Sequence, residues 1–191
     1  LQMTVLGTGG AYPGGGVGGV DWVVRDLYTC PNVKTELTDV FINAGQARAF
    51  RAPGHPQGAW ALELMMDQLA EKIGMDPVEF RTKNAPSISQ GSNGTPPYSS
   101  TGLTACLAEG AKRFGWREAR SKPAGDGAVR RGVGVAAGLW RGGSGGPPAT
   151  IIVKLFADGS ANLNMGASDI GTGTKTVMSM IVAEELGVPL D

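Results

Sequence analysis

Residues 49–63 read AFRAPGHPQGAWALE, a turn rich in glycine and proline that carries one arginine and leads directly into an amphipathic helix. Arg51 stands beside the backbone of Pro53 and Gly54, just before the expected helix N-terminus, where N–H groups have no partner inside the helix. A guanidinium fork next to free N–H groups favours an anion. The stretch therefore predicts an anion-binding turn, and the other elements are arranged around it.

A second turn of the same kind occupies residues 169–176, which read DIGTGTKT and precede another expected helix. Its glycines allow close backbone approach, and its threonine hydroxyls can donate to phosphate or carbonyl oxygens. Plain helix capping is the alternative. Together the two turns suggest one polyanionic ligand held from two sides. The residues of the second turn expected to contact it are Gly171, Thr172, Gly173, Thr174 and Thr176.

Two better-known phosphate motifs do not fit this turn. Gly166 and Gly171 have the spacing of the GxxxxGK(S/T) loop, but Thr172 stands where that loop has lysine. A GxGxxG fingerprint fails as well, because Gly173 is followed by Lys175 and Thr176 rather than by a third glycine. We therefore expect neither a nucleotide-hydrolase loop nor a Rossmann-type dinucleotide fold.

The composition narrows the class of protein. Lysine plus arginine and aspartate plus glutamate number 17 each, so the net charge is zero and no overall field favours nucleic acid or an anionic membrane as a partner. No apolar run approaches the roughly 18 residues that span a bilayer. One histidine and two cysteines without CxxC spacing give little support to a metal held by protein side chains. Any metal must arrive inside a cofactor or bind carboxylates.

Hydrophobic periodicity predicts the elements of the first half. Strands are expected at residues 1–6, 21–24 and 34–43, and residues 7–19 form a glycine-dense connection, with a phosphate-binding nest as the alternative. Asp76 is expected to cap a short helix that begins at Pro77. A longer, core-facing helix is expected at residues 56–73, because apolar side chains recur there at helical spacing: Trp60, Leu62, Met65, Met66, Leu69 and Ile73.

The second half is predicted by the same signals. Residues 85–100 form a surface loop, and residues 103–114 form a helix that Ser100 or Thr101 caps and Gly115 ends. A charged, irregular linker follows. Strands are expected at residues 133–140, 151–156 and 161–165, the last two joined by an Asp-Gly hairpin turn, and a final helix at residues 174–186.

These elements predict an α+β fold, built as two lobes of mixed β-sheet with packed helices. The expected division is residues 1–116 for the first lobe, residues 117–130 for the linker and residues 131–191 for the second lobe. The sequence starts within an expected strand, without an initiator methionine or leader, and ends just after a helix. We therefore expect it to be an internal piece of a longer polypeptide.

Two further residues of the first turn have open roles. Glu63 is expected to do no more than orient Arg51, and not to act as a catalytic base. His55 could hydrogen-bond a ligand, although packing or capping is the favoured interpretation. With one histidine, and with no serine or cysteine placed near it, the sequence assembles no nucleophilic triad.

Several runs of the sequence resemble a known protein family. The runs FRAPGHPQG at residues 50–58 and LAEKIGMDPVEFRTKN at residues 69–84 are similar to the molybdenum-cofactor-binding large subunit of the xanthine dehydrogenase and aldehyde oxidase family. Residues 169–176 and the run AEELGVP at residues 183–189 resemble a later cofactor-binding turn and helix of the same subunit. The resemblance covers most of the chain and is loose at residues 85–100 and after Arg117.

The resemblance implies a molybdenum hydroxylase that oxidises an aldehyde or an N-heterocycle with oxygen taken from water. The cofactor is molybdopterin with molybdenum, which we expect in the cytosine dinucleotide form. Electrons then leave through 2Fe–2S clusters to FAD on partner subunits or domains. The implied partners are the rest of the large subunit, an iron–sulfur subunit, an FAD subunit and a small-molecule substrate, in the cytoplasm or alternatively the periplasm.

Site residues follow from matching positions of the motifs. Arg51 matches an arginine close to the molybdenum, and Ala52 and Gly54 belong to the same cofactor-binding turn. Pro53 takes the position where xanthine-oxidising relatives place an aromatic residue against the substrate, which argues against a stacked purine. Thr172 stands where several relatives have glutamine, so only backbone and hydroxyl donation is expected there.

Two parts of the family pattern lie outside this chain: a glycine-phenylalanine-glycine cofactor loop and the glutamate that acts as general base. Without a base the oxidation cannot proceed well, so the chain alone is expected to be inactive. The rival interpretation is a non-catalytic module that binds phosphate or a nucleotide. A third is a stable structural piece without a ligand.

Overall fold

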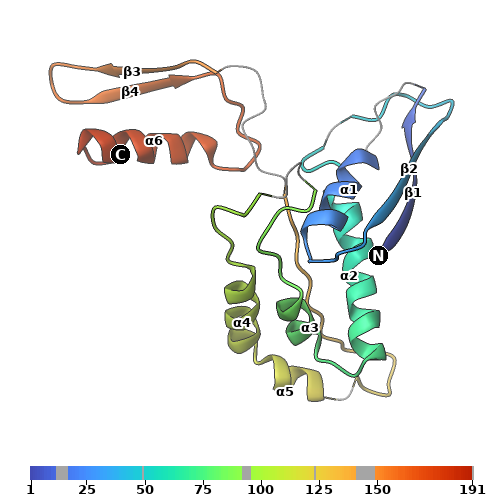
Figure 1. Ribbon diagram of the computed structural model, residues 1–191. Helices are drawn as coiled ribbons and strands as arrows, with labels where there is room; N and C mark the ends of the chain where they lie inside the picture. The colour runs from blue at the N-terminus through green and yellow to red at the C-terminus, as the bar shows by residue number, and fades with distance from the viewer. Residues whose placement is uncertain (12–16, 49, 92–95, 123, 141–148, 191) are drawn as a thin grey trace. The chain divides into compact units, whose positions relative to one another are not determined.

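The computed structural model describes residues 1–11, 17–48, 50–91, 96–122, 124–140 and 149–190 (Figure 1). The chain forms two compact units, Leu1–Arg141 and Gly142–Asp191. Each unit is described by itself below. The cofactor-binding lobes expected at residues 1–116 and 131–191 stay a prediction, because compactness does not assign cofactor contacts.

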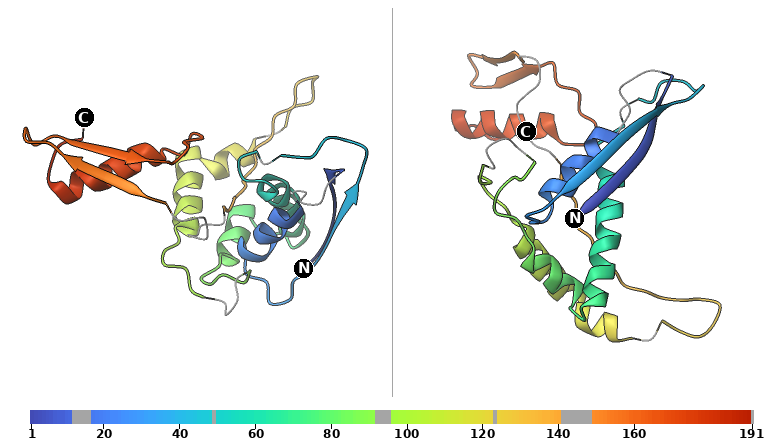
Figure 2. Two further views of the ribbon diagram at one scale, coloured as in Figure 1. Left: turned by 90° about the horizontal axis from the view of Figure 1, so that it is seen from above. Right: turned by 45° about the vertical axis from the view of Figure 1, so that its right-hand side comes forward.

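A parallel pair of strands opens the first unit. β1 (Gln2–Gly10) pairs with β2 (Lys34–Phe41) in a register that sets Val5 beside Leu37, with a shift between Gly7 and Gly10. Parallel neighbours need a crossover connection, which α1 (Val17–Asp26) supplies. Figure 2 shows the two strands side by side. The strands predicted near residues 1–6 and 34–43 are confirmed.

The strand predicted at residues 21–24 is wrong, because these residues lie within α1. Val20, Val23 and Val24 are buried at the three- and four-residue spacing of a helix, together with Leu27 just beyond its end. The four residues 21–24 are too few to show this helical spacing, and the β-branched pair Val23 and Val24 suggests a strand. The connection predicted at residues 7–19 is also shorter than expected, since β1 continues to Gly10 and α1 begins at Val17; residues 12–16 lie outside the described residues.

α2 (His55–Lys72) packs against α1 to form the core of this unit. The two helices approach closely at Gly58, where a Cβ atom would lie 2.9 Å from the carbonyl oxygen of Val20. The core-facing stripe predicted for this helix is only partly correct, because the side chain of Trp60 is 70% exposed and that of Ile73 is 57% exposed. The side of α2 that carries Leu62 and Met66 is the covered one, and it faces α1 and the partly buried residues that pack on the same cluster. The buried cluster consists of Val23, Leu27, Tyr28, Leu62 and Met66.

Three shorter helices complete the unit. α3 (Pro77–Lys83) begins as predicted, with Asp76 Oδ1 accepting hydrogen bonds from the N–H groups of Val78 and Glu79. α4 (Leu103–Phe114) ends at Gly115, as the sequence predicted, and Gly115 has a left-handed φ of 68°. Its N-cap, however, is Gly102 rather than Ser100 or Thr101. α5 (Trp116–Ser121) makes the start of the expected irregular linker helical.

The loop at residues 85–100 is more tightly held than a surface loop. An isolated bridge joins Ile88 to Pro97, and Ser89 is buried. Asp26, at the end of α1, accepts hydrogen bonds from the Ser89 hydroxyl and from the Gly91 N–H. One buried carboxylate therefore fixes this loop against the first crossover helix.

The strand predicted at residues 133–140 is wrong. These residues form no helix or strand, and Ala137 and Leu139 pack against the buried cluster of the first unit. The alternation of small and large residues suggested a strand. In the structure the same residues form an irregular segment whose apolar side chains cover the buried cluster. In Figure 1 this segment is the tan-to-orange trace that runs back from beyond α5.

The second unit is a hairpin followed by a helix. β3 (Ile151–Leu155) pairs antiparallel with β4 (Ala161–Met165), with Val153 opposite Leu163. The predicted Asp-Gly turn is confirmed: Gly159 has a φ of 87°, and Asp158 Oδ1 accepts hydrogen bonds from the N–H and hydroxyl of Ser160. α6 (Thr174–Leu186) has the predicted bounds.

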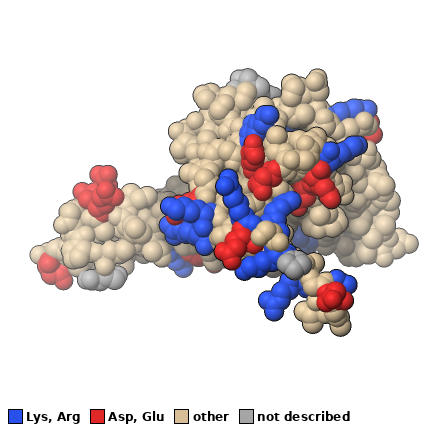
Figure 3. Space-filling view, turned by 90° about the horizontal axis from the view of Figure 1, so that it is seen from below, with Lys and Arg blue, Asp and Glu red and all other residues tan. Residues whose placement is uncertain are grey.

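The predicted α+β class is confirmed by these helices and small sheets. Lysine and arginine side chains are interspersed with acidic ones on the face shown in Figure 3, in keeping with the net charge of zero. In the described part of the chain, no helix combines the length and apolar character needed to cross a bilayer.

Candidate functional site

A cavity of about 730 Å³ lies in the first unit, where β1, the start of α1 and the predicted anion-binding turn meet. Glycines and small residues make up much of its wall. Among the residues that line it are Gly7, Gly19, Pro53, Gly54, His55 and Trp140. The motif that opens the sequence analysis therefore contributes directly to a cavity.

The turn has an unusual backbone. Gly54 has a φ of 80° and Ala52 a φ of 60°, so two residues of the turn adopt the left-handed conformation. Glycine does so without steric cost, whereas alanine rarely does. The N–H of His55 donates to the carbonyl of Ala52 at 3.0 Å, and the N–H of Gly58 donates to that of Gly54 at 2.9 Å. These bonds join the turn to the first turn of α2.

Contact with α1 fixes the turn from its other side. A Cβ atom on Gly19 would lie 2.0 Å from the carbonyl oxygen of Pro53, so backbone touches backbone at this point. Only glycine permits that approach. The position of the turn is therefore set by a residue on the crossover helix, which sequence reasoning did not single out.

The predicted site residues of this turn separate into two groups. Pro53 and Gly54 line the cavity, whereas Arg51 and Ala52 do not belong to its wall. Arg51 is exposed, and its guanidinium has no hydrogen-bond or ion-pair partner among the described residues. Arg48 is a second exposed arginine beside the turn, and it lines the cavity although the sequence analysis did not name it.

His55 is buried in the cavity wall, with 7% of its surface exposed. Its Nδ1 atom lies 3.2 Å from the carbonyl oxygen of Pro53, and its ring centroid lies 4.5 Å from that of Trp140. Its Nε2 atom is buried without a hydrogen-bond partner in the described structure. The imidazole is packed, as the sequence analysis favoured, but one of its nitrogens is left unsatisfied.

The role predicted for Glu63 is wrong, because it does not orient Arg51. Glu63 Oε2 accepts a hydrogen bond from Arg81 Nε at 2.7 Å, and Glu63 Oε1 accepts one from the Tyr28 hydroxyl at 2.6 Å. Arg81 is completely buried and also lies 2.8 Å from Asp67 Oδ1. The correct partner is on α3, a fold contact that spacing within α2 does not reveal.

The groups of this network shift one another's pKa values. Burial raises the pKa of the Tyr28 hydroxyl, and the hydrogen bond to Glu63 raises it further. Burial opposes the charge on Arg81, but the adjacent Glu63 carboxylate outweighs it and raises the pKa of the guanidinium. The Tyr28 hydroxyl therefore keeps its proton and the Arg81 guanidinium keeps its charge. The network joins α2 to α3 as a structural element outside the cavity.

The second predicted turn lies in the second unit and is closed by its own side chain. Asp169 Oδ1 accepts hydrogen bonds from the N–H groups of Gly171 at 2.8 Å, Thr172 at 3.0 Å and Gly173 at 3.3 Å. The first of these bonds does most to hold the pKa of Asp169 below its usual value. The backbone donors expected to hold a ligand are thus engaged by a carboxylate of the chain.

The hydroxyls of this turn are arranged differently. The Thr172 and Thr174 hydroxyls lie 2.9 Å apart, and Gly173 is the left-handed N-cap of α6 with a φ of 74°. Thr176, on the first turn of the helix, is exposed. Contact of Gly171, Thr172, Gly173, Thr174 and Thr176 with a ligand stays a prediction.

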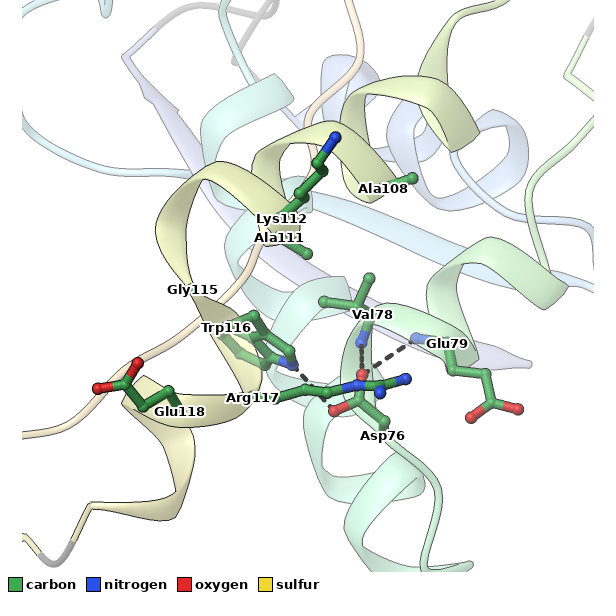
Figure 4. Close-up of a pocket in the computed structure, with 10 residues that line it drawn as sticks. All are labelled: Asp76, Val78, Glu79, Ala108, Ala111, Lys112, Gly115, Trp116, Arg117 and Glu118. Atoms are coloured by element: carbon green, nitrogen blue, oxygen red, sulfur yellow. Dashed lines mark hydrogen bonds between the residues drawn. The ribbon is translucent and has the colours of Figure 1, made fainter.

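A second cavity, of about 690 Å³, lies between α3, α4 and α5 (Figure 4). At its base Asp76 Oδ2 accepts a hydrogen bond from Trp116 Nε1 at 2.9 Å, while Oδ1 caps α3. Burial alone would raise the pKa of Asp76, but the bonds from Trp116 and from the backbone of Glu79 and Val78 lower it. Because this carboxylate is already paired on both oxygens, it serves the fold.

No cluster of three or more histidine, cysteine, aspartate or glutamate side chains suited to a metal ion occurs within the described ranges. The cavity at the first turn is the candidate site, because Pro53, Gly54 and His55 of the predicted anion-binding turn line it. Two family models, each described as a molybdopterin cofactor-binding domain, match residues 1–85 and residues 109–191. The chain belongs to the molybdopterin cofactor-binding domain family. The first match contains the cavity-lining turn, and the second contains the Gly171 turn.

Relatives of this molybdopterin cofactor-binding chain are named as subunits of larger enzymes. It is 38% identical to the aldehyde oxidoreductase molybdenum-binding subunit PaoC of Escherichia coli O157:H7, over 86% of this chain and 22% of that protein. It is also 38% identical to a xanthine dehydrogenase molybdenum-binding subunit of the same organism, over 78% of this chain and 21% of that protein. The chain thus spans about a fifth of the length of these relatives.

Solved structures agree with this assignment. The aldehyde oxidoreductase from Desulfovibrio gigas matches with a TM-score of 0.63 and 28% identity, over 84% of this chain and 19% of that one. The aldehyde oxidoreductase from Desulfovibrio desulfuricans matches with a TM-score of 0.65 and 26% identity, over the same shares. The resemblance to the xanthine dehydrogenase and aldehyde oxidase family is confirmed.

Proposed function

We propose that this chain forms part of a molybdenum hydroxylase that oxidises an aldehyde or an N-heterocycle with oxygen taken from water. The observation that carries the proposal is the cavity of about 730 Å³ built on the FRAPGHPQG turn, within the residues that match a molybdopterin cofactor-binding domain. The names of the relatives, aldehyde oxidoreductase and xanthine dehydrogenase, support the reaction class.

The residues of the first unit fit a flat, anionic cofactor. Gly7, Gly19 and Gly54 line the cavity without side chains that would fill it. Arg48 and Arg51 are exposed cations beside the turn that can attract phosphate oxygens. When bound, the molybdenum centre supplies the redox chemistry. The chain's own residues orient the cofactor and screen it from water.

The second turn would add hydroxyl donors from Thr172, Thr174 and Thr176. Its backbone N–H groups become available to a ligand only when the Asp169 carboxylate is displaced, because that carboxylate now accepts from three of them. We propose that the cofactor, or the remainder of the subunit, competes with Asp169 for these donors.

The finer assignments extend the same proposal. We propose the cytosine dinucleotide form of molybdopterin, with 2Fe–2S clusters and FAD on partner subunits or domains, and a cytoplasmic enzyme. Pro53 takes the motif position at which xanthine-oxidising relatives place an aromatic residue, so we propose a substrate other than a stacked purine. Because the chain covers only about a fifth of its relatives, we expect activity from the complete enzyme and none from residues 1–191 alone.

Molybdenum and pterin content of the full-length protein, purified with its partner subunits, tests this function. We expect about one molybdenum per large subunit in the wild type and a clear loss of both in R51A. The matched control is R113A, which removes an exposed arginine paired with Glu109 on α4. A protein with phosphate or nucleotide but neither molybdenum nor pterin is instead the non-catalytic binding module. Equal content in R51A and R113A contradicts the role of Arg51.

A further inference from the structure

The strand β1 has one edge without a strand partner. It pairs with β2 alone in a two-stranded sheet, so its backbone groups directed away from β2 meet no other strand in the described part of the chain. Exposed edges are usually protected by charged residues or proline. β2 carries Lys34, Glu36 and Asp39, whereas residues 2–10 of β1 include neither a charged residue nor a proline. The edge of β1 therefore lacks the features that suit an edge to water.

A groove of about 580 Å³ follows this edge. Residues 3–6 of β1 all line it, and successive side chains of a strand point to opposite faces of the sheet. A cavity lined by both sets lies along the edge of the strand and not over one face. β2 contributes no residue to the described lining, and the opposite wall is the start of α2, with Pro56 and Trp60.

The groove is apolar. No charged residue is among the described residues that line it. The side chain of Leu6 is 73% exposed and that of Trp60 is 70% exposed. Large apolar side chains that gather at one groove mark an interaction site, whereas single ones scattered over a surface do not. The groove and the edge together suit an extended, uncharged segment with apolar side chains.

The groove is continuous with the candidate cofactor cavity. Val5, Leu6, Val20 and Gln57 line both of them. β1 then continues along the larger cavity through residues 7–8. A segment that pairs with this edge therefore lies in the groove at one end and at the cofactor cavity at the other.

We propose that a strand from the part of the longer polypeptide outside residues 1–191 adds to the free edge of β1. It places an apolar side chain against Trp60 and completes the wall of the candidate cofactor cavity. In strand addition, backbone hydrogen bonds supply affinity and side-chain pockets supply specificity. Because the chain spans about a fifth of the length of its relatives, most of such a polypeptide lies outside it.

A strand of the same polypeptide has an advantage over one from a second copy, because tethering raises its effective concentration at the edge. The pairing itself depends only on the fold. Closure of a cofactor site by that strand rests on the proposed function.

Photo-crosslinking in the full-length protein, purified with its partner subunits, tests the strand. The crosslinking amino acid p-benzoylphenylalanine replaces Trp60 or, separately, Thr4, both of which line the groove. Glu71, exposed on the same helix and outside the groove, is the control position. We expect the two groove positions to crosslink within the large subunit to one segment outside residues 1–191, at sites no further apart than one strand, about ten residues. Glu71 should give no crosslink to that segment.

Crosslinks to a second copy of the large subunit, or to a partner subunit, overturn this choice of occupant. Crosslinks from Trp60 and Thr4 to two separate segments overturn a single strand, and crosslinks no stronger than those of Glu71 overturn docking in the groove. If one replacement prevents folding, the other position decides.

Closure of the cavity is tested by the pterin content of two further full-length variants. W60E places a carboxylate in the groove, and I73E places one at an exposed apolar position of the same helix region, outside the groove. We expect W60E to retain about tenfold less pterin than I73E, because a carboxylate is costly to cover with an apolar strand. Equal pterin content overturns closure by the strand. Absence of pterin from the wild type removes the proposed function, while the crosslinks still decide the pairing.

Discussion

Arg81 Nε donates to Glu63 Oε2 across 2.7 Å, which joins α3 to α2 inside the first unit. Arg81 is fully enclosed, and its remaining donors reach the carbonyl oxygens of Glu63 and Pro77 and the Asp67 carboxylate. α2 is also the helix that begins at His55 in the cavity wall. The ion pair therefore holds in place the helix that presents the candidate site.

Replacing Glu63 with glutamine should destabilise the protein strongly. Removing one partner of a buried ion pair leaves an uncompensated charge and costs about 3–5 kcal/mol. Because Asp67 still contacts Arg81, we expect E63Q to lower the free energy of unfolding by about 3 kcal/mol, near the lower end of this range. Urea unfolding of the full-length protein measures this loss.

The matched control is E109Q, which breaks the exposed pair between Glu109 and Arg113 on α4. Pairs of that kind contribute about 0.3–0.5 kcal/mol. If E63Q and E109Q unfold at the same urea concentration, the buried network is not a source of stability.

Replacing the adjacent glycines Gly18 and Gly19 of α1 with alanine should have opposite effects on stability. A Cβ atom on Gly18 meets nothing within 4 Å, so G18A should be neutral or stabilise the helix by about 0.5–1 kcal/mol. A Cβ atom on Gly19 would lie 2.0 Å from the Pro53 carbonyl oxygen, so G19A must displace the turn and should cost about 1–3 kcal/mol.

Thermal unfolding and pterin content of both variants check this pair. G19A should lose cofactor together with stability, whereas G18A should keep both. Equal behaviour of the two variants would mean that the turn does not rest on α1 as the structure shows.

The Asp76 carboxylate should contribute to stability in a pH-dependent way. Because its pKa is lowered in the folded state, the contribution is complete above its unfolded pKa of about 3.9 and is lost as the pH falls below that value. W116F removes the indole donor and should cost about 1 kcal/mol at neutral pH. The difference in stability between W116F and wild type should shrink as the pH is lowered toward 3, in a series of urea titrations. A difference that stays constant over that range would assign the loss to packing of the indole.

Asp169 should control the turn that precedes α6. The pKa of Asp169 is also lowered in the folded state. The ionised carboxylate therefore holds the turn at pH values above its unfolded pKa of about 3.9, and the turn opens as the pH falls below that value. D169A should open the turn at neutral pH and speed amide hydrogen exchange at Gly171 and Gly173 in the full-length protein. D158A, at the hairpin turn, is the control, because the Asp158 carboxylate makes comparable bonds to Ser160 but touches none of these amides. Unchanged exchange in D169A would show that other groups hold the turn.

The local signals in the sequence were reliable where one short segment sets the structure. Asp76 before Pro77 predicted the start of α3, Gly115 predicted the end of α4, and the Asp-Gly pair at 158–159 predicted a hairpin. In each case a backbone conformation or a cap decides the outcome within a few residues.

Predictions that depend on distant contacts were less successful. The run at residues 21–24 has strand-forming residues but becomes helical because Val23, together with Leu27, packs on α2. Glu63 could not be paired with Arg81 without knowing that α3 folds back on α2. At the candidate site, the turn carrying Pro53 and Gly54 was identified from sequence. The unsatisfied His55 nitrogen and the Gly19 contact required the fold.

The parallel pair of β1 and β2 has a consequence for handling this chain in isolation. Each strand has one edge that faces no other strand of the described structure, and small parallel sheets are normally covered on both faces. Open edges of this kind recruit strands from other molecules. At laboratory concentrations, separately expressed residues 1–191 should self-associate edge to edge into aggregates, so their low solubility would report unsatisfied strand pairing and not a failure to bind cofactor.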